Sequence, residues 1–260
     1  MQWKLYYKWL YKFGSPKWFY ETSGKWLCGL SIVTACLLTI SLVWGLAFAP
    51  ADYLQGNSYR IIFIHVPSAF LAQAIYILMA SAAIIYLVWK IKIADMAQAV
   101  LAPIGTSFTL LALFTGAVWG KPTWGTWWVW DARLTSMLIL LFLYLGLLSL
   151  RNAMNNNAAA RGCSIMAIVG VVNIPIIKFS VEWWNTLHQG TTLTLTERPS
   201  MAIEMLMPLL MSIIGFYLFF TLIFIQRLRI EIMYRERKTS WVRQLISTSG
   251  SGSIFSSTTV

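Results

Sequence analysis

The chain has 260 residues, of which 58% are hydrophobic and only 11% are charged, and its formal net charge at pH 7 is +11. This composition is too apolar for a soluble globular domain of ordinary type. It indicates an integral membrane protein. Attraction to anionic lipid is enough to account for the positive charge, so the charge gives no case for nucleic-acid binding.

Six apolar runs are long enough, or nearly so, to cross a hydrocarbon core of about 30 Å, which takes about 20 residues of α-helix. We predict an all-α integral membrane protein, a bundle of six transmembrane helices with an outward tryptophan-rich loop. A cleaved signal peptide is the alternative for the first run, but a signal core has only about 7 to 15 apolar residues. The predicted spans are residues 26–49, 67–89, 96–119, 134–150, 163–181 and 201–225.

Basic residues near the ends of the runs predict the orientation. Fifteen of the 20 lysines and arginines fall on the side that carries both termini. We therefore expect cytoplasmic termini and a six-helix domain over residues 26–226. Residues 1–25 mix aromatic and basic groups, which suits a segment lying on the cytoplasmic leaflet, although a floppy basic leader is the alternative. Residues 227–260 form a basic tail rich in Ser and Thr, expected to be disordered from Ser247.

The segment between the third and fourth runs, residues 120–133, is predicted to be a loop on the outward face. Trp119 and this loop together hold five tryptophans within twelve residues. An ordinary interfacial belt would spread its tryptophans over several helix ends. The concentration instead predicts a platform for a flat, amphipathic ligand. Trp124, Trp127 and Trp128 are the expected contacts, whereas Trp119 and Trp130 lie nearer the helix ends and suit ordinary anchors.

The two histidines of the chain, His65 and His188, are both predicted on the outward face. Pro67 suits the first position of a helix, which places His65 just before the second span. His188 falls in the third outward loop, residues 182–200. A hydrogen-bonded interfacial side chain is the alternative for each histidine. Their common level with the tryptophan loop favours two axial ligands of one haem iron.

An acid and a base, Asp131 and Arg133, close the tryptophan loop where the fourth helix begins. Asp131 is either a helix cap or a site residue. The planar guanidinium of Arg133 matches a carboxylate with two hydrogen bonds, and a haem carries two propionates. The other outward cations that could serve are Lys121, Arg60 and Arg198.

Several remaining residues have a structural explanation. Prolines inside three spans, at positions 103, 175 and 208, predict kinks. The ionisable Lys178 and Glu204 lie near the outer ends of spans, where their charges can reach the surface. Neither suggests a proton path. The three cysteines show no CxxC or CxxCH spacing, so no disulfide, zinc site or covalent haem attachment is indicated.

The motif Trp119-Gly120, followed by Trp124-Gly-Thr-Trp-Trp-Val-Trp-Asp131-Ala-Arg133, resembles the tryptophan-rich signature of haem-handling membrane proteins. Six spans at this length resemble, over nearly the whole chain, the cytochrome c maturation protein C family, also called haem exporter protein C. The resemblance implies a bacterial inner-membrane protein that is not an enzyme. It implies that haem b, held without a covalent bond at the periplasmic face, passes to the periplasmic haem chaperone, cytochrome c maturation protein E.

The family's functional residues match particular positions of this chain. The resemblance implies His65 and His188 as the outward histidines, and Trp119, Trp124, Trp127, Trp128 and Asp131 as the aromatic and acidic residues of the site. It also implies as partners the ABC transporter subunits A and B and a small membrane protein D. The sequence has no GxxxxGK[ST] motif, which fits an ATPase supplied by a partner.

Two other classes of function remain as alternatives. A cytochrome b-like redox subunit requires histidine pairs deep within spans, and the sequence has none. A haem permease favours broken helices and polar groups at mid-membrane. The clustering of the candidate residues in the outward loops argues against the permease.

Overall fold

The computed structural model describes residues 12, 14–184, 186–188 and 201–254. Six helices among these residues are long and apolar enough to cross a membrane, which confirms the predicted all-α bundle. The elements, in chain order, are α2 (Pro16–Ser23), η1 (Gly24–Trp26), α3 (Leu27–Val43), η2 (Trp44–Phe48), η3 (Asn57–Ile61), α4 (Ile62–Trp89), α5 (Lys92–Trp124), α6 (Ala132–Ala153), α7 (Asn156–Gly170), α8 (Asn173–Trp183), α9 (Ile203–Arg235) and α10 (Ser240–Ile254).

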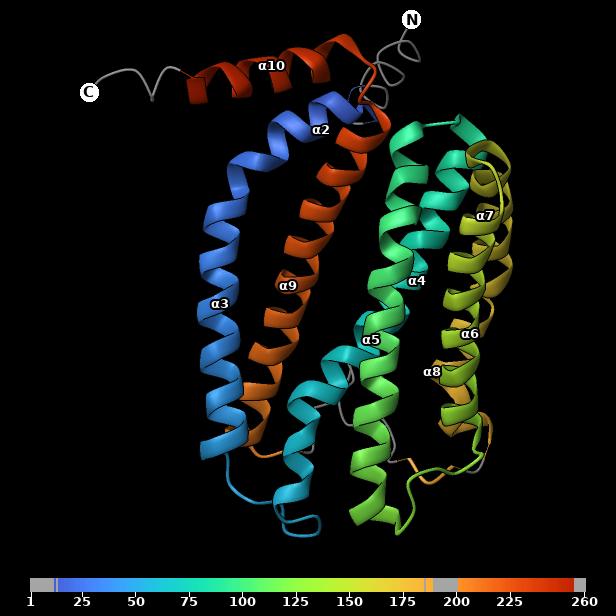
Figure 1. Cartoon of the computed structure of the whole chain (residues 1–260). Helices are drawn as coiled ribbons and strands as arrows, with labels where there is room; N and C mark the ends of the chain where they lie inside the picture. The colour runs from blue at the N-terminus through green and yellow to red at the C-terminus, as the bar shows by residue number, and fades with distance from the viewer. Residues whose placement is uncertain (1–11, 13, 185, 189–200, 255–260) are drawn as a thin grey trace, which may run out of the picture.

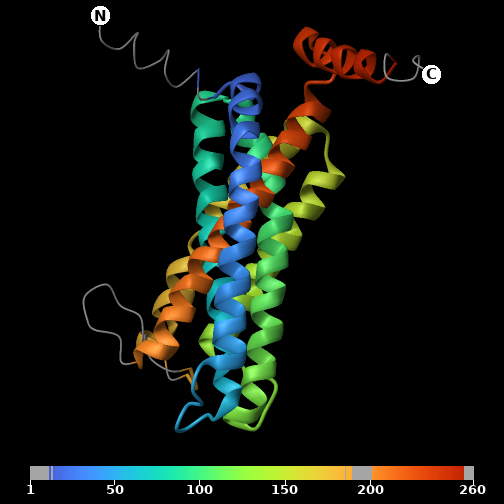
Figure 2. The same ribbon diagram turned by 90° about the vertical axis from the view of Figure 1, so that its left-hand side faces the viewer.

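The long helices stand side by side, and α2 and α10 lie at the same end of the bundle (Figure 1). We call this the basic end; it also holds the α4–α5 and α6–α7 connections. The opposite end, where residues 119–131 lie, is called the tryptophan end. Helix α9 runs obliquely across α3, and α10 lies across the basic end (Figure 2). The main core lies between α4, α5, α6, α7 and α9, where Tyr76 and Tyr144 are fully buried.

Helix α5 is longer than the predicted third span and carries the start of the tryptophan segment. Its 33 residues extend about 50 Å at 1.5 Å per residue, which exceeds the hydrocarbon core. The expectation that residues 120–124 form a loop is therefore wrong. The helix ends at Gly125, which adopts a left-handed conformation (φ 77°) and donates its N–H to the carbonyl of Lys121. Glycine takes this conformation without steric cost, so it ends the helix here.

Helix α4 begins before Pro67, so the prediction that Pro67 is its first residue is wrong. The helical path starts with η3 at Asn57 and continues as α4 from Ile62. The early turns are stabilised by packing, because Ile62 and Phe63 are buried against Leu209 of α9. That burial outweighs the backbone hydrogen bond that Pro67 cannot donate. As a result, His65 lies within the first turn of α4 and not before it.

The fifth span is interrupted, as the proline at position 175 predicts. It consists of α7 and α8, which together cross the bundle. Pro175 has no N–H to donate to the carbonyl of Val171, and the break falls there. The amide of Asn173 donates to the carbonyl of Ser136 at 2.9 Å, which ties the break to α6.

The ends of the described chain are both helical. The Arg229 guanidinium of α9 lies 3.9 Å from the centre of the Tyr20 ring, which fixes α2 against α9. Residues 1–11 and 13, part of the predicted interfacial segment, lie outside the described residues. Helix α10 extends as far as Ile254, and the disorder expected from Ser247 stays a prediction. The hydroxyls of Ser247 and Thr248 donate to the carbonyl of Gln244, so these polar side chains are compatible with the helix.

Candidate functional site at the tryptophan end

His65 projects from α4 against α5, where one of its ring nitrogens has a defined partner. Its Nδ1 lies 3.0 Å from Oγ1 of Thr115. That hydroxyl donates its own hydrogen to the carbonyl of Leu111 at 2.6 Å, so its oxygen accepts from the imidazole. The geometry therefore assigns the proton to Nδ1 and leaves the Nε2 lone pair free for a metal.

Gly116 gives the His65 ring the room that it occupies. A Cβ atom at this position would lie 3.0 Å from Cε1 of the imidazole. This distance is shorter than an ordinary van der Waals contact, so any larger residue would displace the ring. A glycine inside helix α5 thus sets the position of a histidine on α4.

His188 follows α8 and pairs with the acid that begins α6. Its Nδ1 lies 3.2 Å from Oδ2 of Asp131. The other carboxylate oxygen, Oδ1, accepts from the N–H of Leu134 at 2.8 Å and caps the helix. Both readings of Asp131, cap and site residue, are therefore consistent with its position. Burial lowers the pKa of His188 below its usual 6.5, and the Asp131 carboxylate opposes part of that shift.

Two tryptophans of α5 each contact one histidine. The rings of Trp119 and His65 lie 5.6 Å apart, and those of Trp124 and His188 lie 4.8 Å apart, both in edge-on arrangements. Trp119 also donates its Nε1–H to Oε1 of Gln55 at 2.8 Å. The last turns of α5 therefore contact both imidazoles. Trp119 was expected as an anchor from its place near the helix end and as a site residue from the resemblance, and its ring contacts a histidine.

The tryptophans beyond α5 are more open. Trp127 is 57% exposed and Trp130 is 74% exposed. Trp128 is partly buried, with its ring edge-on to Trp130 at 5.4 Å. The Nε1 of Trp128 is buried and has no hydrogen-bond partner among the described residues. An unpaired buried donor is unfavourable, so this N–H is suited to an acceptor supplied from outside the chain.

The candidate cations fall into different environments. Arg133 donates through Nε to Oγ of Ser180 at 3.3 Å and through Nη2 to the carbonyl of Lys178 at 3.5 Å, so it joins α6 to α8. Arg60 donates to the carbonyls of Leu46 and Ala49, both at 2.7 Å, and so caps the first span. Lys121 donates to the carbonyl of Gly125 at 3.1 Å. Arg198 lies outside the described residues.

Three contributors were missed from the sequence: Gln55, Thr115 and Gly116. None belongs to a recognisable motif. The signal for Thr115 is its spacing of four residues from Trp119, which places both on one helix face. Recognising it requires knowing that α5 is helical through this region. Gln55 lies in a connection 64 residues away from its partner and has no such signal.

The fold and the site together define a class: multi-pass membrane proteins that carry two imidazoles among tryptophans at one end of a helical bundle. The family model for heme exporter protein C (CcmC) matches residues 9–243. The chain is 50% identical over 243 residues to heme exporter protein C of Haemophilus influenzae, covering 93% of this chain and 99% of the relative. It is 49% identical over 245 residues to that of Escherichia coli, covering 94% and 99%.

A more distant relative, heme exporter protein C of Bradyrhizobium diazoefficiens, is 43% identical over 231 residues, or 88% of each chain. The chain therefore belongs to the heme exporter protein C family. Membership confirms the predictions of a multi-pass membrane protein of cytochrome c biogenesis and of a component that is not an enzyme.

Proposed function

We propose that this protein binds haem at the periplasmic face of the bacterial inner membrane and delivers it to the periplasmic haem chaperone, cytochrome c maturation protein E. The observation that carries the proposal is the state of the two imidazoles. Both are held through Nδ1, by Thr115 and by Asp131. In each ring Nε2 remains available, and it would be the atom that binds the haem iron. Partners of this kind fix the ring orientation and increase ligand basicity.

The surrounding aromatic residues supply the contacts that a flat macrocycle needs. Trp119 and Trp124 border the histidines, and Trp127 and Trp128 extend the aromatic surface beyond α5. The unpaired Nε1–H of Trp128 suits a propionate oxygen as acceptor. Arg133 still has N–H groups beyond the two that it uses, and these suit the second propionate.

Release of haem to a partner requires an open site. The exposure of Trp127 leaves aromatic surface available to an incoming protein. The chaperone would take over contacts as it docks on the tryptophan end, and the ABC transporter subunits A and B and the small membrane protein D would complete the assembly. Basic side chains gather at the opposite end, which supports a cytoplasmic basic end and a periplasmic tryptophan end.

Optical spectra of the purified full-length protein with haem test the binding step. We expect His65→Ala and His188→Ala each to alter the low-spin spectrum, and Trp127→Ala/Trp128→Ala to lower haem retention several-fold. Trp89→Ala is the matched control, because Trp89 is an exposed tryptophan at the basic end. One unchanged spectrum across all variants would show that the histidines are structural.

Delivery is tested separately, by mixing the haem-loaded protein with purified apo-chaperone and following the spectrum of each after separation. Transfer from the unchanged protein supports delivery. Stable binding without transfer would refute delivery while leaving the binding site in place. Uptake of labelled haem into sealed vesicles by this chain alone would favour a permease instead.

A further inference from the structure

A second polar region lies at the basic end, far from the tryptophans. A cavity of about 630 Å³ opens there between the ends of α4, α5, α7 and α9. Tyr86 and Tyr234 contribute aromatic walls. The charged side chains that line it are Lys90, Lys92, Asp95, Arg235, Glu236, Arg237 and Lys238. We call this the basic pocket.

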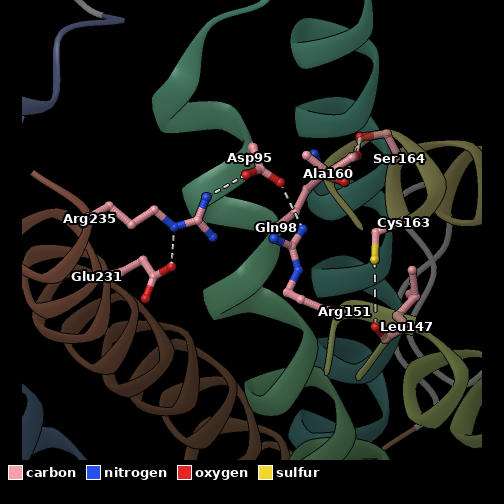
Figure 3. A network of polar contacts seen from close by, with 9 residues as sticks. All are labelled: Asp95, Gln98, Leu147, Arg151, Ala160, Cys163, Ser164, Glu231 and Arg235. Carbon is pink, nitrogen blue, oxygen red and sulfur yellow. Dashed lines mark hydrogen bonds and ion pairs between the residues drawn. The ribbon is translucent and has the colours of Figure 1, made fainter. Parts of the chain in front are cut away.

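The two carboxylates of the basic pocket do not neutralise its five cations. Asp95 is buried, and its two oxygens accept from Arg151 at 2.8 Å and from Arg235 at 2.5 Å (Figure 3). Arg235 is further paired with Glu231 of its own helix at 2.5 Å. Asp95 therefore joins α5 to α6 and α9 and is fully engaged.

Lys90, Lys92 and Lys238 are left as excess positive charge in the pocket. Within the part of the chain that the structure describes, no carboxylate lies at ion-pair distance from any of the three. All three lysines line the same cavity. Such an arrangement attracts an anion that can contact several of them together.

Lys90 occupies a position whose backbone conformation favours glycine. It ends α4 in the left-handed conformation (φ 56°), the only described residue other than glycine with positive φ. Its Nζ lies 5.4 Å from the centre of the Tyr86 ring, so the side chain folds back along the pocket wall. A lysine here costs conformational energy that a glycine would avoid.

The helix faces beside the pocket are apolar and exposed. On α4 they include Ile84, Ile85 and Val88. These residues belong to membrane spans, so their exposed faces suit acyl chains. Tyr86, Trp89 and Tyr234 lie at the same level, where aromatic residues favour the membrane–water interface.

We propose that the basic pocket binds the phosphate headgroup of an anionic phospholipid from the leaflet at the basic end, with Lys90, Lys92 and Lys238 as its ligands. Basic pockets between transmembrane helices bind headgroups of this kind. The adjoining apolar faces favour a lipid over a free phosphate, because they offer surface to the acyl chains that a soluble anion does not use. The bound headgroup joins the α4–α5 connection to the end of α9.

The test uses the full-length protein in nanodiscs of phosphatidylcholine with or without cardiolipin, and native mass spectrometry to count bound lipid. We expect Lys92→Gln and Lys238→Gln each to weaken cardiolipin binding about five-fold, which corresponds to about 1 kcal/mol per lysine near the surface. Lys90→Gly should weaken binding similarly while keeping or increasing thermal stability, because glycine fits the left-handed turn. A loss of binding in that variant is therefore not a loss of folding.

Lys25→Gln is the matched control, since it removes one charge at the basic end outside the pocket and no ion pair at Lys25 is found among the described residues. Unchanged cardiolipin binding in this control supports the pocket. An equal loss in control and pocket variants would overturn the proposal in favour of diffuse attraction. Inorganic phosphate is added in a third arm. Binding of phosphate to the pocket as tight as that of cardiolipin would show that the site takes a soluble anion and not a lipid.

Discussion

Asp131 uses its two carboxylate oxygens for different purposes. One caps α6 through the N–H of Leu134, and the other accepts from His188. A helix cap contributes about 1 kcal/mol, and loss of the hydrogen-bond partner of a metal ligand typically lowers affinity 10- to 100-fold. A single buried residue thus couples the start of a helix to the orientation of a proposed ligand. Thr115, inside α5, orients His65 through a hydrogen bond without a charge.

The pH dependence of haem affinity follows from the environment of His188. In the proposed site, neutral imidazole is the iron ligand, and burial holds the pKa of His188 below 6.5. Haem affinity should therefore stay flat from pH 8 to 6.5 and fall only below that range, as the ring takes up a proton. Below pH 6.5 the unfolded chain binds that proton more readily than the folded apoprotein, so stability should also fall with pH. Haem titrations and thermal melts across the range measure both.

Asp131→Asn is the matched variant for this experiment. Asparagine caps a helix as well as aspartate does, so thermal stability should be nearly unchanged. Without the carboxylate, the pKa of His188 should fall further and the loss of affinity should move to lower pH. Affinity at neutral pH should drop about 10- to 100-fold, because the ligand loses its anionic partner. An identical pH profile in the variant would contradict the role of Asp131.

The helices follow their predicted positions in the middle and depart from them at the ends. Hydrophobic runs predict the membrane-spanning turns, because the hydrocarbon core accepts only helices with apolar side chains. The end of a helix depends on smaller effects: packing of Phe63 extends α4 past Pro67, and Gly125 ends α5 after Trp124. These extra turns place Trp124 and His65 of the proposed site on helices and not on loops.

Helix α5 offers a direct test through Gly116. Gly116→Ala should displace the His65 ring by a few tenths of an ångström, alter the low-spin haem spectrum and weaken affinity. The helix itself should gain about 0.5–1 kcal/mol from the replacement, so the fold should survive. Visible spectra and thermal melts of the purified protein separate the two effects.

Gly29→Ala is the control for this prediction. Gly29 also lies inside a helix, α3, and a Cβ atom there would meet nothing within 4 Å. It should gain similar helix stability and leave the haem spectrum unchanged. If Gly116→Ala behaved like Gly29→Ala, the close packing of Gly116 against the imidazole would have no bearing on haem.

At the scale of the whole molecule, the two ends of the bundle differ in chemistry. Aromatic residues and both histidines gather at one end, and the basic pocket and the Asp95 ion pairs gather at the other. Unequal distribution of lysine and arginine sets the orientation of a membrane protein. The proposed haem site and the proposed lipid contact therefore lie at opposite leaflets of the membrane.

This polarity predicts the outcome of cysteine labelling in spheroplasts. In a variant with its three native cysteines replaced by alanine, Tyr53→Cys should react with a membrane-impermeant maleimide without lysis, because Tyr53 is 91% exposed at the tryptophan end. Lys238→Cys at the basic end should react only after the membrane is permeabilised. The reverse pattern would place the tryptophan end in the cytoplasm and contradict the proposed orientation.

The class of protein, the six spans and the residue types of the candidate site can be predicted from the sequence, because hydropathy and composition respond directly to the bilayer and the tryptophan motif lies in a single segment. The pairing of those residues is visible only in the folded chain. His65 meets Thr115 across 50 residues of chain, and Asp131 meets His188 across 57. Such pairings follow from how helices pack against one another, and no local pattern encodes them.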